Sequence, residues 1–125
     1  PNRNEFELAT GVGTGDPAFV DTAHELVRSA ELSGLLVTCG EEGMTLFLST
    51  GEVLHQDAMA REVFDVSGAG DTVVAIIAVG VAAGLTWAEC IKWATLGASA
   101  VVSRFGTSVV RKSDLNLTVV GDRER

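Results

Sequence analysis

The sequence DVSGAGDT, residues 65–72, decides how the fold is interpreted, because it joins two glycines to an acidic residue just ahead of an apolar run, residues 73–83. Gly68 and Gly70 allow backbone conformations that other residues resist. If a helix begins at Ala69 or Gly70, the free N–H groups of its first turn point into the preceding loop, where the helix dipole favours an anion. The stretch therefore predicts a loop that turns into a helix, with a place for an anion at the turn.

Asp71 would lie in the first turn of that helix, beside the anion. A carboxylate in this place can accept a proton from a hydroxyl group that attacks phosphorus. The spacing allows a second interpretation equally well, in which Ser67 and Asp71 cap a helix and the glycines form an ordinary turn. The stretch is not a Walker A loop, because it lacks the G-x-x-x-x-G-K-[ST] pattern and has no neighbouring lysine.

Composition limits the classes of protein and partner. The 125 residues are 46% hydrophobic and 21% charged, which suits one domain or a piece of a larger one. A formal net charge of -8, with Lys and Arg scattered along the chain, argues against nucleic acid and anionic membrane as partners. Cys39 and Cys90 are far apart and in apolar surroundings, so we expect buried, reduced thiols in a cytoplasmic protein. The chain starts at Pro1 without a methionine, and we expect a fragment.

The first half of the chain predicts a helix, a strand and a hairpin. The helix is predicted over residues 18–32, with Asp16 as N-cap, Pro17 at the first helical position and Ser33-Gly34 as its end. Its apolar face is expected to hold Phe19, Ala23, Leu26, Val27 and Ala30. Residues 35–39 are expected to form a buried parallel strand, and residues 44–49 to form a hairpin with a short run near Val53, around Thr50-Gly51.

The second half predicts two helices. Residues 73–83 are expected to form a helix that is buried on most sides and ends at Gly84. Thr86 and Glu89 have the spacing of a capping box that opens a helix over residues 87–103. Small residues fill that helix's second half, which favours close packing of another helix or contact with a flat ligand: Ala94, Gly97, Ala98, Ser99 and Ala100.

This order of elements is an α/β pattern with two to four strands and four helices, which leaves a sheet edge uncovered. A last short helical turn is expected at residues 112–115, and the charged residues 118–125 are expected to be a frayed tail. The isolated His24 and His55 are given little chance of a catalytic role.

Several motifs in order resemble the ribokinase-like (PfkB) carbohydrate kinases. DVSGAGDT is similar to the family's D-T-x-G-A-G-D, PNRNE at residues 1–5 to P-N-x-x-E, and VTCGEEG at residues 37–43 to V-T-x-G-x-x-G. ATLGASAVVSRFGTSVV, residues 94–110, resembles the helix and loop that close the adenine pocket. The resemblance implies the C-terminal portion of a ribokinase-like three-layer α/β/α domain, formed by residues 1–117.

The resemblance also implies site residues and ligands, with ATP and Mg²⁺ as cofactors. Asp71 would be the catalytic base that deprotonates the sugar hydroxyl, and the backbone N–H groups of Gly68, Ala69 and Gly70 would form an anion hole for the γ-phosphoryl group. Asn2 and Glu5 would place phosphates and hydrated Mg²⁺. Three residues, Thr38, Gly40 and Gly43, would line the ribose and phosphates, and two, Ala98 and Val102, would flank adenine.

A monovalent cation, K⁺, is implied beside the anion hole. It would be held by Asp65 and Ser67 with carbonyl groups near Val101, Arg104 and Gly106. The family often has Thr where this chain has Val66, which removes one hydroxyl group from that loop but leaves the backbone contacts.

Within the family, DVSGAGDTV, the alanine-rich helix and GTS are most similar to heptose 7-phosphate kinase domains that are joined to a heptose 1-phosphate adenylyltransferase in ADP-heptose and lipopolysaccharide precursor synthesis. The resemblance implies transfer of the γ-phosphoryl group of ATP to a sugar hydroxyl, at the anomeric position of heptose 7-phosphate. Another sugar, sugar phosphate or nucleoside acceptor, and a nucleotide-binding half-domain without transfer, are the alternatives.

In the family the sugar-binding residues and the lid lie mostly in the first half, ahead of P-N-x-x-E. The chain alone is therefore expected to be inactive as a kinase. It is also expected to form a homo-oligomer or to associate with the missing half.

Overall fold

The computed structural model describes residues 1–59 and 69–102. Its contacts divide the chain into two compact units, residues 1–57 and residues 58–125, and each unit is described by itself. In the described ranges, the structure has three strands and four α-helices, which confirms the predicted α/β pattern. None of the described helices has the length and apolar character that crossing a membrane requires.

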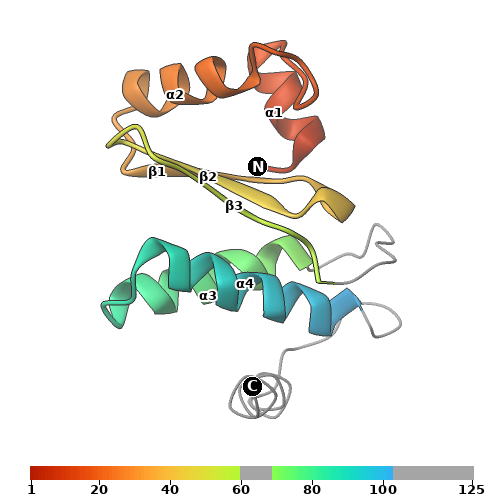
Figure 1. Cartoon of the computed structure of the whole chain (residues 1–125), viewed down its shortest axis with the longest axis vertical. Coiled ribbons are helices and arrows are strands. Elements are labelled where there is room, and N and C mark those ends of the chain that lie inside the picture. The colour runs from red at the N-terminus through yellow and green to blue at the C-terminus, as the bar shows by residue number, and fades with distance from the viewer. Residues whose placement is uncertain (60–68, 103–125) are drawn as a thin grey trace. The chain divides into compact units, whose positions relative to one another are not determined.

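The first unit is a three-stranded antiparallel sheet with two helices along one face (Figure 1). The strand order is β1-β2-β3, with Leu36 of β1 opposite Leu46 of β2, and Leu46 opposite Leu54 of β3. The elements in chain order are α1 (Arg3–Thr10), α2 (Phe19–Ser29), β1 (Gly34–Thr38), the short 3-10 helix η1 (Gly40–Glu42), β2 (Met44–Leu48) and β3 (Val53–Gln56). The predicted hairpin between β2 and β3 is confirmed.

Three phenylalanines join the helices of this unit to its sheet. The ring of Phe6 on α1 stacks on that of Phe19 on α2, with centroids 5.1 Å apart, and Phe19 packs against Phe47 of β2 at 5.2 Å. Leu35 and Val37 of β1 are buried in the same cluster. Leu35 and Val37 of β1 thus form one apolar layer with Phe47 of β2 beneath the helices.

The predicted start of α2 is wrong. The helix begins at Phe19, and Ala18 occupies the N-cap position without a side-chain cap. Asp16 instead accepts a hydrogen bond from the Ala18 N–H at Oδ1, 2.8 Å away, and its carbonyl oxygen accepts one from the Phe19 N–H at 3.0 Å. Asp16 and Pro17 therefore form the turn that leads into the helix.

The predicted end of α2 is also wrong, because the helix stops at Ser29. Glu31 takes a left-handed conformation with φ 54°, and the Leu32 N–H donates to the Val27 carbonyl at 2.9 Å. This is the hydrogen bond that closes many helices. Ala30 therefore lies beyond the helix and is exposed, while Gly34 is already the first residue of β1.

The strand β1 pairs differently from the prediction. Residues 35–39 were expected to be a parallel strand, but β1 forms an antiparallel ladder with β2. A single parallel bridge between Asn2 and Thr38 lies at its end. The short turn at residues 40–43 allows β2 to reverse directly beside β1, and only an antiparallel pair can be joined by so short a connection.

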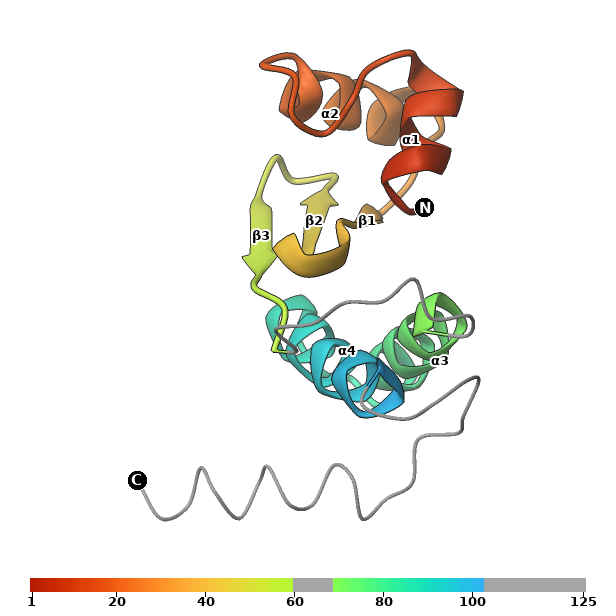
Figure 2. The same ribbon diagram turned by 90° about the vertical axis from the view of Figure 1, so that its right-hand side faces the viewer.

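The second unit contains α3 (Ala69–Ala82) and α4 (Trp87–Val102), which pack side by side (Figure 2). Gly84, with φ 82°, ends α3 as predicted, and the Leu85 N–H donates to the Gly80 carbonyl at 3.0 Å. The capping box is confirmed as well: the Glu89 N–H donates to Thr86 Oγ1 at 3.2 Å, and the Thr86 N–H to Glu89 Oε2 at 3.0 Å.

The expectation that the first of these helices is buried on most sides is wrong for the described residues. Val73 is buried, but Val74 and Val79 expose 68% and 69% of their surface. The sequence could not distinguish the buried face from the exposed face, because no charged residue occurs from residue 72 to residue 88. A helix that is apolar all round gives no periodic signal. Only the stripe that faces α4 is buried.

Glycines allow α3 and α4 to approach closely. A Cβ atom added to Gly80 would lie 2.7 Å from Cys90 Sγ, and one added to Gly97 would lie 2.2 Å from Ile76 Cδ1. Ala94, on the same helix as Gly97, is fully buried. At these positions the structure supports helix packing as the role of the small residues.

We predict that the effect of Gly80→Ala on the free energy of unfolding depends in sign on the residue at position 90. Alanine favours a helix over glycine by about 1 kcal/mol, but overpacking against Cys90 costs about 1–3 kcal/mol. Gly80→Ala should therefore lower the free energy of unfolding in the wild-type chain and raise it in a Cys90→Ala chain, measured by urea denaturation of all four proteins. Equal effects in both backgrounds would contradict the contact.

Candidate functional site

The predicted site residues fall in two groups, one in each unit. The first group lies where α1 begins. The Asn2 side chain accepts a hydrogen bond from the Glu5 N–H at 2.8 Å, and Glu5 Oε1 accepts one from the Asn2 N–H at 3.0 Å. These reciprocal bonds form a capping box, which gives the P-N-x-x-E spacing a structural role in starting α1.

The end of β1 lies beside this capping box. The Thr38 N–H donates to the Pro1 carbonyl at 2.9 Å, and Thr38 and Asn2 form the parallel bridge. The chain segment ahead of α1 is thus hydrogen-bonded to the end of β1. The structure therefore brings together the predicted residues Asn2, Glu5 and Thr38 from parts of the sequence that are far apart.

Two glycines shape the turn that follows β1. Gly40 has φ 58° and Gly43 has φ 89° with ψ -138°, conformations that favour glycine. The Cys39 N–H donates to the Gly43 carbonyl at 2.7 Å, which closes the turn. The predicted residues Gly40 and Gly43 therefore lie in the turn that follows Thr38, and both have the left-handed backbone conformations that glycine favours.

Arg3 is a residue of this group that the sequence analysis missed. Its Nη2 lies 2.9 Å from the position that a Cβ atom of Gly40 would take, and it forms an ion pair with Glu41 at 3.8 Å. Arg3 lies inside P-N-x-x-E, at a position that the motif leaves open. The only sequence signal for Arg3 was therefore its positive charge beside the motif residues Asn2 and Glu5.

Both cysteine thiols are free and buried, as predicted. Burial raises the pKa of the Cys39 thiol, the positive charge of Arg3 opposes that increase, and Glu42 adds to it. Burial raises the pKa of Cys90 as well, with a smaller contribution from Glu89. Both thiols are therefore protonated at neutral pH and poorly nucleophilic.

The second group lies at the start of α3 and in the second half of α4. The helix α3 begins at Ala69 and carries Asp71 in its first turn, both as predicted, and the Asp71 side chain is exposed. Ala98 is half-buried on α4, and Val101 and Val102 are the last two residues of that helix. The helix α3 has 14 residues, so its N-terminus carries the partial positive charge and the free N–H groups of a full helix.

The remaining predicted site residues lie outside the described residues, as do the predicted last helical turn and the tail. They are Asp65, Ser67, Gly68, Arg104 and Gly106.

The described residues contain no group of three or more His, Cys, Asp or Glu side chains that could hold a metal ion. The carboxylate of Glu5 is nevertheless a suitable single ligand, because Mg²⁺ is usually bound through one or two carboxylates together with water and substrate phosphates. One of its oxygens, Oε1, already accepts the capping hydrogen bond, which orients the carboxylate. The residues of the first group thus fit hydrated Mg²⁺.

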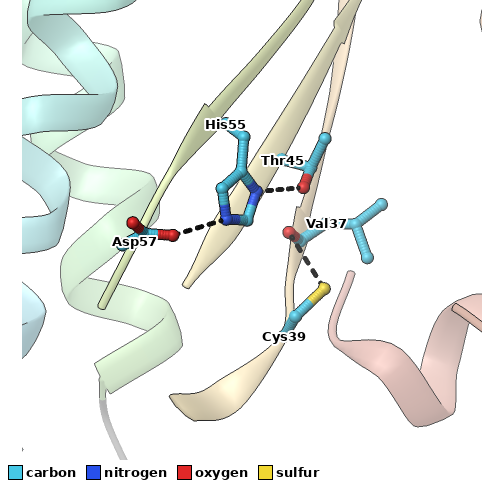
Figure 3. A network of polar contacts seen from close by, with 5 residues as sticks. All are labelled: Val37, Cys39, Thr45, His55 and Asp57. Carbon is cyan, nitrogen blue, oxygen red and sulfur yellow. Dashed lines mark hydrogen bonds and ion pairs between the residues drawn. The ribbon is translucent and has the colours of Figure 1, made fainter. Parts of the chain in front are cut away.

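A hydrogen-bonded network connects β2 and β3 (Figure 3). Thr45 Oγ1 lies 2.8 Å from His55 Nδ1, and His55 Nε2 lies 3.1 Å from Asp57 Oδ1. The hydroxyl, imidazole and carboxylate are all at least partly exposed, and Thr45 and His55 are direct cross-strand partners. This arrangement stabilises the pairing of the two strands. His24 packs edge-on against Phe47.

We predict that His55→Ala lowers the free energy of unfolding by about 0.5–1.5 kcal/mol, because it removes exposed hydrogen bonds. Thr45→Val should lower it in the wild-type chain and should have no further effect when His55 is already alanine. Urea denaturation of the four proteins measures the coupling. Additive losses would show that the two side chains stabilise the sheet independently.

Comparison with protein families gives a match over most of the chain. The pfkB family carbohydrate kinase model matches residues 1–113. The chain is 45% identical over 115 residues to the bifunctional protein HldE of Shewanella piezotolerans, covering 92% of this chain and 24% of that protein. It is also 45% identical over 115 residues to the D-beta-D-heptose 7-phosphate kinase of Bordetella bronchiseptica, covering 92% of this chain and 36% of that protein. The chain thus spans about a quarter to a third of these curated relatives.

Solved structures share the fold. The ribokinase of Arabidopsis thaliana, complexed with ribose and ATP, matches with a TM-score of 0.81 and 28% identity, over 94% of this chain and 38% of that one. Phosphofructokinase-2 of Escherichia coli, with substrates and products, matches with a TM-score of 0.82 and 21% identity, over all of this chain and 40% of that one. The predicted ribokinase-like α/β fold is confirmed.

Proposed function

The chain belongs to the pfkB family of carbohydrate kinases, and we propose that it forms the nucleotide-binding and catalytic part of an ATP-dependent sugar kinase. The observation that carries this proposal is the position of Asp71 in the first turn of α3, directly after Gly70. A kinase needs a base for the attacking hydroxyl and positive field for the transferring phosphoryl group, and this turn offers both.

In the proposed reaction, Asp71 accepts the proton of the sugar hydroxyl as that oxygen attacks the γ-phosphorus, and the bond from the γ-phosphorus to the β,γ-bridging oxygen breaks so that ADP leaves. Backbone N–H groups of Gly68, Ala69 and Gly70 donate to the oxygens of the transferring group, where negative charge is held. Glu5 and Asn2 orient the phosphates and hydrated Mg²⁺, and Mg²⁺ supplies charge neutralisation when bound.

The proposed nucleotide contacts are those that the resemblance to the family implies. The ribose and phosphates of the nucleotide would lie against Thr38, Gly40 and Gly43, and its adenine against Ala98 and Val102. A K⁺ ion would steady the anion hole from the loops that contain Asp65, Ser67 and Arg104, together with carbonyls near Val101 and Gly106. This assignment rests on the matching motif positions in the sequence.

The proposed acceptor is the anomeric hydroxyl of heptose 7-phosphate, in the synthesis of ADP-heptose for lipopolysaccharide. Support for heptose 7-phosphate comes from the 45% identity to the Bordetella bronchiseptica enzyme, which is named as a D-beta-D-heptose 7-phosphate kinase. Another sugar, sugar phosphate or nucleoside is the second candidate acceptor. This alternative is supported by the Arabidopsis thaliana ribokinase, which is 28% identical to this chain and was solved in complex with ribose.

A cytoplasmic protein fits the two free cysteines. A homo-oligomer, or association with the acceptor-binding part, fits the exposed valines of α3.

We predict that Mg·ATP raises the melting temperature of the chain saturably, more in potassium than without it. Ligand at 100 times its dissociation constant stabilises by about 2.7 kcal/mol. Gly70→Asp should abolish the shift, because it puts a negative charge at the anion site.

Gly70 suits this test because a Cβ atom there meets no atom of the described residues within 4 Å, so the variant should fold. Gly15→Asp is the matched control, since Gly15 lies outside both groups and also has no neighbour within 4 Å among the residues that the structure describes. A folded chain that Mg·ATP does not stabilise, or a Gly70→Asp variant with the wild-type shift, would contradict the phosphate site.

We also predict that Asp71→Asn lowers kcat by at least about a hundredfold, and up to about 10⁴-fold, while nucleotide binding survives. The assay uses a chimaera in which this chain replaces the matching segment of the Bordetella bronchiseptica kinase, with heptose 7-phosphate, other sugars, sugar phosphates and nucleosides offered as acceptors. Asp21→Asn is the control, because Asp21 is an exposed carboxylate in the first turn of α2. Near-normal turnover in Asp71→Asn would exclude it as the base.

A further inference from the structure

We propose that the guanidinium group of Arg3 binds the phosphate groups of the nucleotide, and that it exchanges its ion pair with Glu41 for this contact when Mg·ATP arrives. The inference rests on the proposed function, because it adds a residue to the same nucleotide site. It identifies Arg3 as a determinant of affinity for phosphorylated nucleotides over the nucleoside.

The first support is position. Arg3 begins α1, between the capping residues Asn2 and Glu5, and its side chain reaches the turn after β1. Its Nη2 and Cζ atoms lie 2.9 and 3.6 Å from the place of a Gly40 Cβ atom. The guanidinium therefore fills the space where any other residue at position 40 would place its side chain, beside the backbone that is proposed to line the phosphates.

The second support is the weakness of the present partner. The Arg3 Nη2 and Glu41 Oε2 atoms are 3.8 Å apart, and the two side chains expose 40% and 63% of their surface. Such exposed pairs contribute about 0–1 kcal/mol to stability. A guanidinium group has a planar set of donors that can form two parallel hydrogen bonds with a phosphate. At 3.8 Å, the Glu41 carboxylate does not form such hydrogen bonds with Arg3.

The third support is charge. Residues 1–57 contain ten Asp and Glu but only two Lys or Arg, Arg3 and Arg28. Glu41 and Glu42 lie in the turn itself, so a triphosphate beside Gly40 would meet repulsion unless a cation offsets it. Arg3 lies in this place, whereas Arg28 pairs with Glu25 on α2. The positive charge of Arg3 is already felt in the turn, where it opposes the rise in the pKa of Cys39.

The test compares the wild-type chain with Arg3→Gln and with the control Arg28→Gln, by isothermal titration with Mg·ATP, Mg·ADP and adenosine. Arg3→Gln should weaken Mg·ATP binding by roughly ten- to a hundredfold, the usual effect of losing a charged hydrogen bond. It should leave adenosine binding and the melting temperature unchanged. Arg28→Gln should match the wild type with all three ligands.

Three results would overturn the proposal, and they are distinct. Wild-type affinity for Mg·ATP in Arg3→Gln would show that Arg3 only holds the turn. An equal loss of Mg·ATP and adenosine binding would show a structural defect in place of a phosphate contact. A wild-type chain that binds adenosine but gains nothing from phosphates would refute the proposed phosphate site and this inference together.

A second variant tests the exchange of partners. Glu41→Gln frees Arg3, so it should tighten Mg·ATP binding by about 1.5- to 5-fold in the wild-type background. In the Arg3→Gln background, this gain should be smaller, because only the general loss of a negative charge is left. An equal gain in both backgrounds would refute the exchange.

Discussion

The stacked rings of Phe6, Phe19 and Phe47 are the contact on which the first unit depends. They come from α1, α2 and β2, and burial of each ring contributes about 1.5–3 kcal/mol. Because Phe6 lies one turn after Arg3, the same stack that fixes α1 on the sheet also fixes its first turn. The core of the unit therefore positions its N-terminal polar residues beside the end of β1.

Local signals in the sequence were sufficient wherever a feature depends on residues only a few positions apart. The hairpin at residues 44–56, the end of α3 at Gly84 and the capping box of Thr86 and Glu89 are of this kind. The bounds of α2 are different, because Ala18 and Glu31 give no sequence signal of a helix end. The helix ends where Glu31 takes a left-handed conformation and the Leu32 N–H donates to the Val27 carbonyl, and intrinsic propensity is too weak to reveal such a position.

The candidate site divides in the same way. The resemblance to family motifs identified Asn2, Glu5, Thr38 and Gly40. Hydrogen bonds hold Asn2 and Glu5 together and join the Pro1 carbonyl to Thr38, and Gly40 lies in the turn that follows Thr38. The spacing also predicted Asp71 in the first turn of α3. Arg3 could not be identified from sequence, because its meaning depends on a glycine far along the chain. Only the fold shows that its guanidinium lies where a side chain of residue 40 would be.

The small residues of α4 show how one run of sequence serves two constraints. Gly97 faces α3, since any side chain there would meet Ile76. Successive residues of a helix are rotated by about 100°, so Ala98 points in a different direction from Gly97 and is only half-buried. Packing against α3 therefore explains Gly97 but not Ala98. The sequence offered packing and a flat ligand as alternatives for the whole run. The structure supports packing at Gly97, and the adenine proposal concerns the face that carries Ala98.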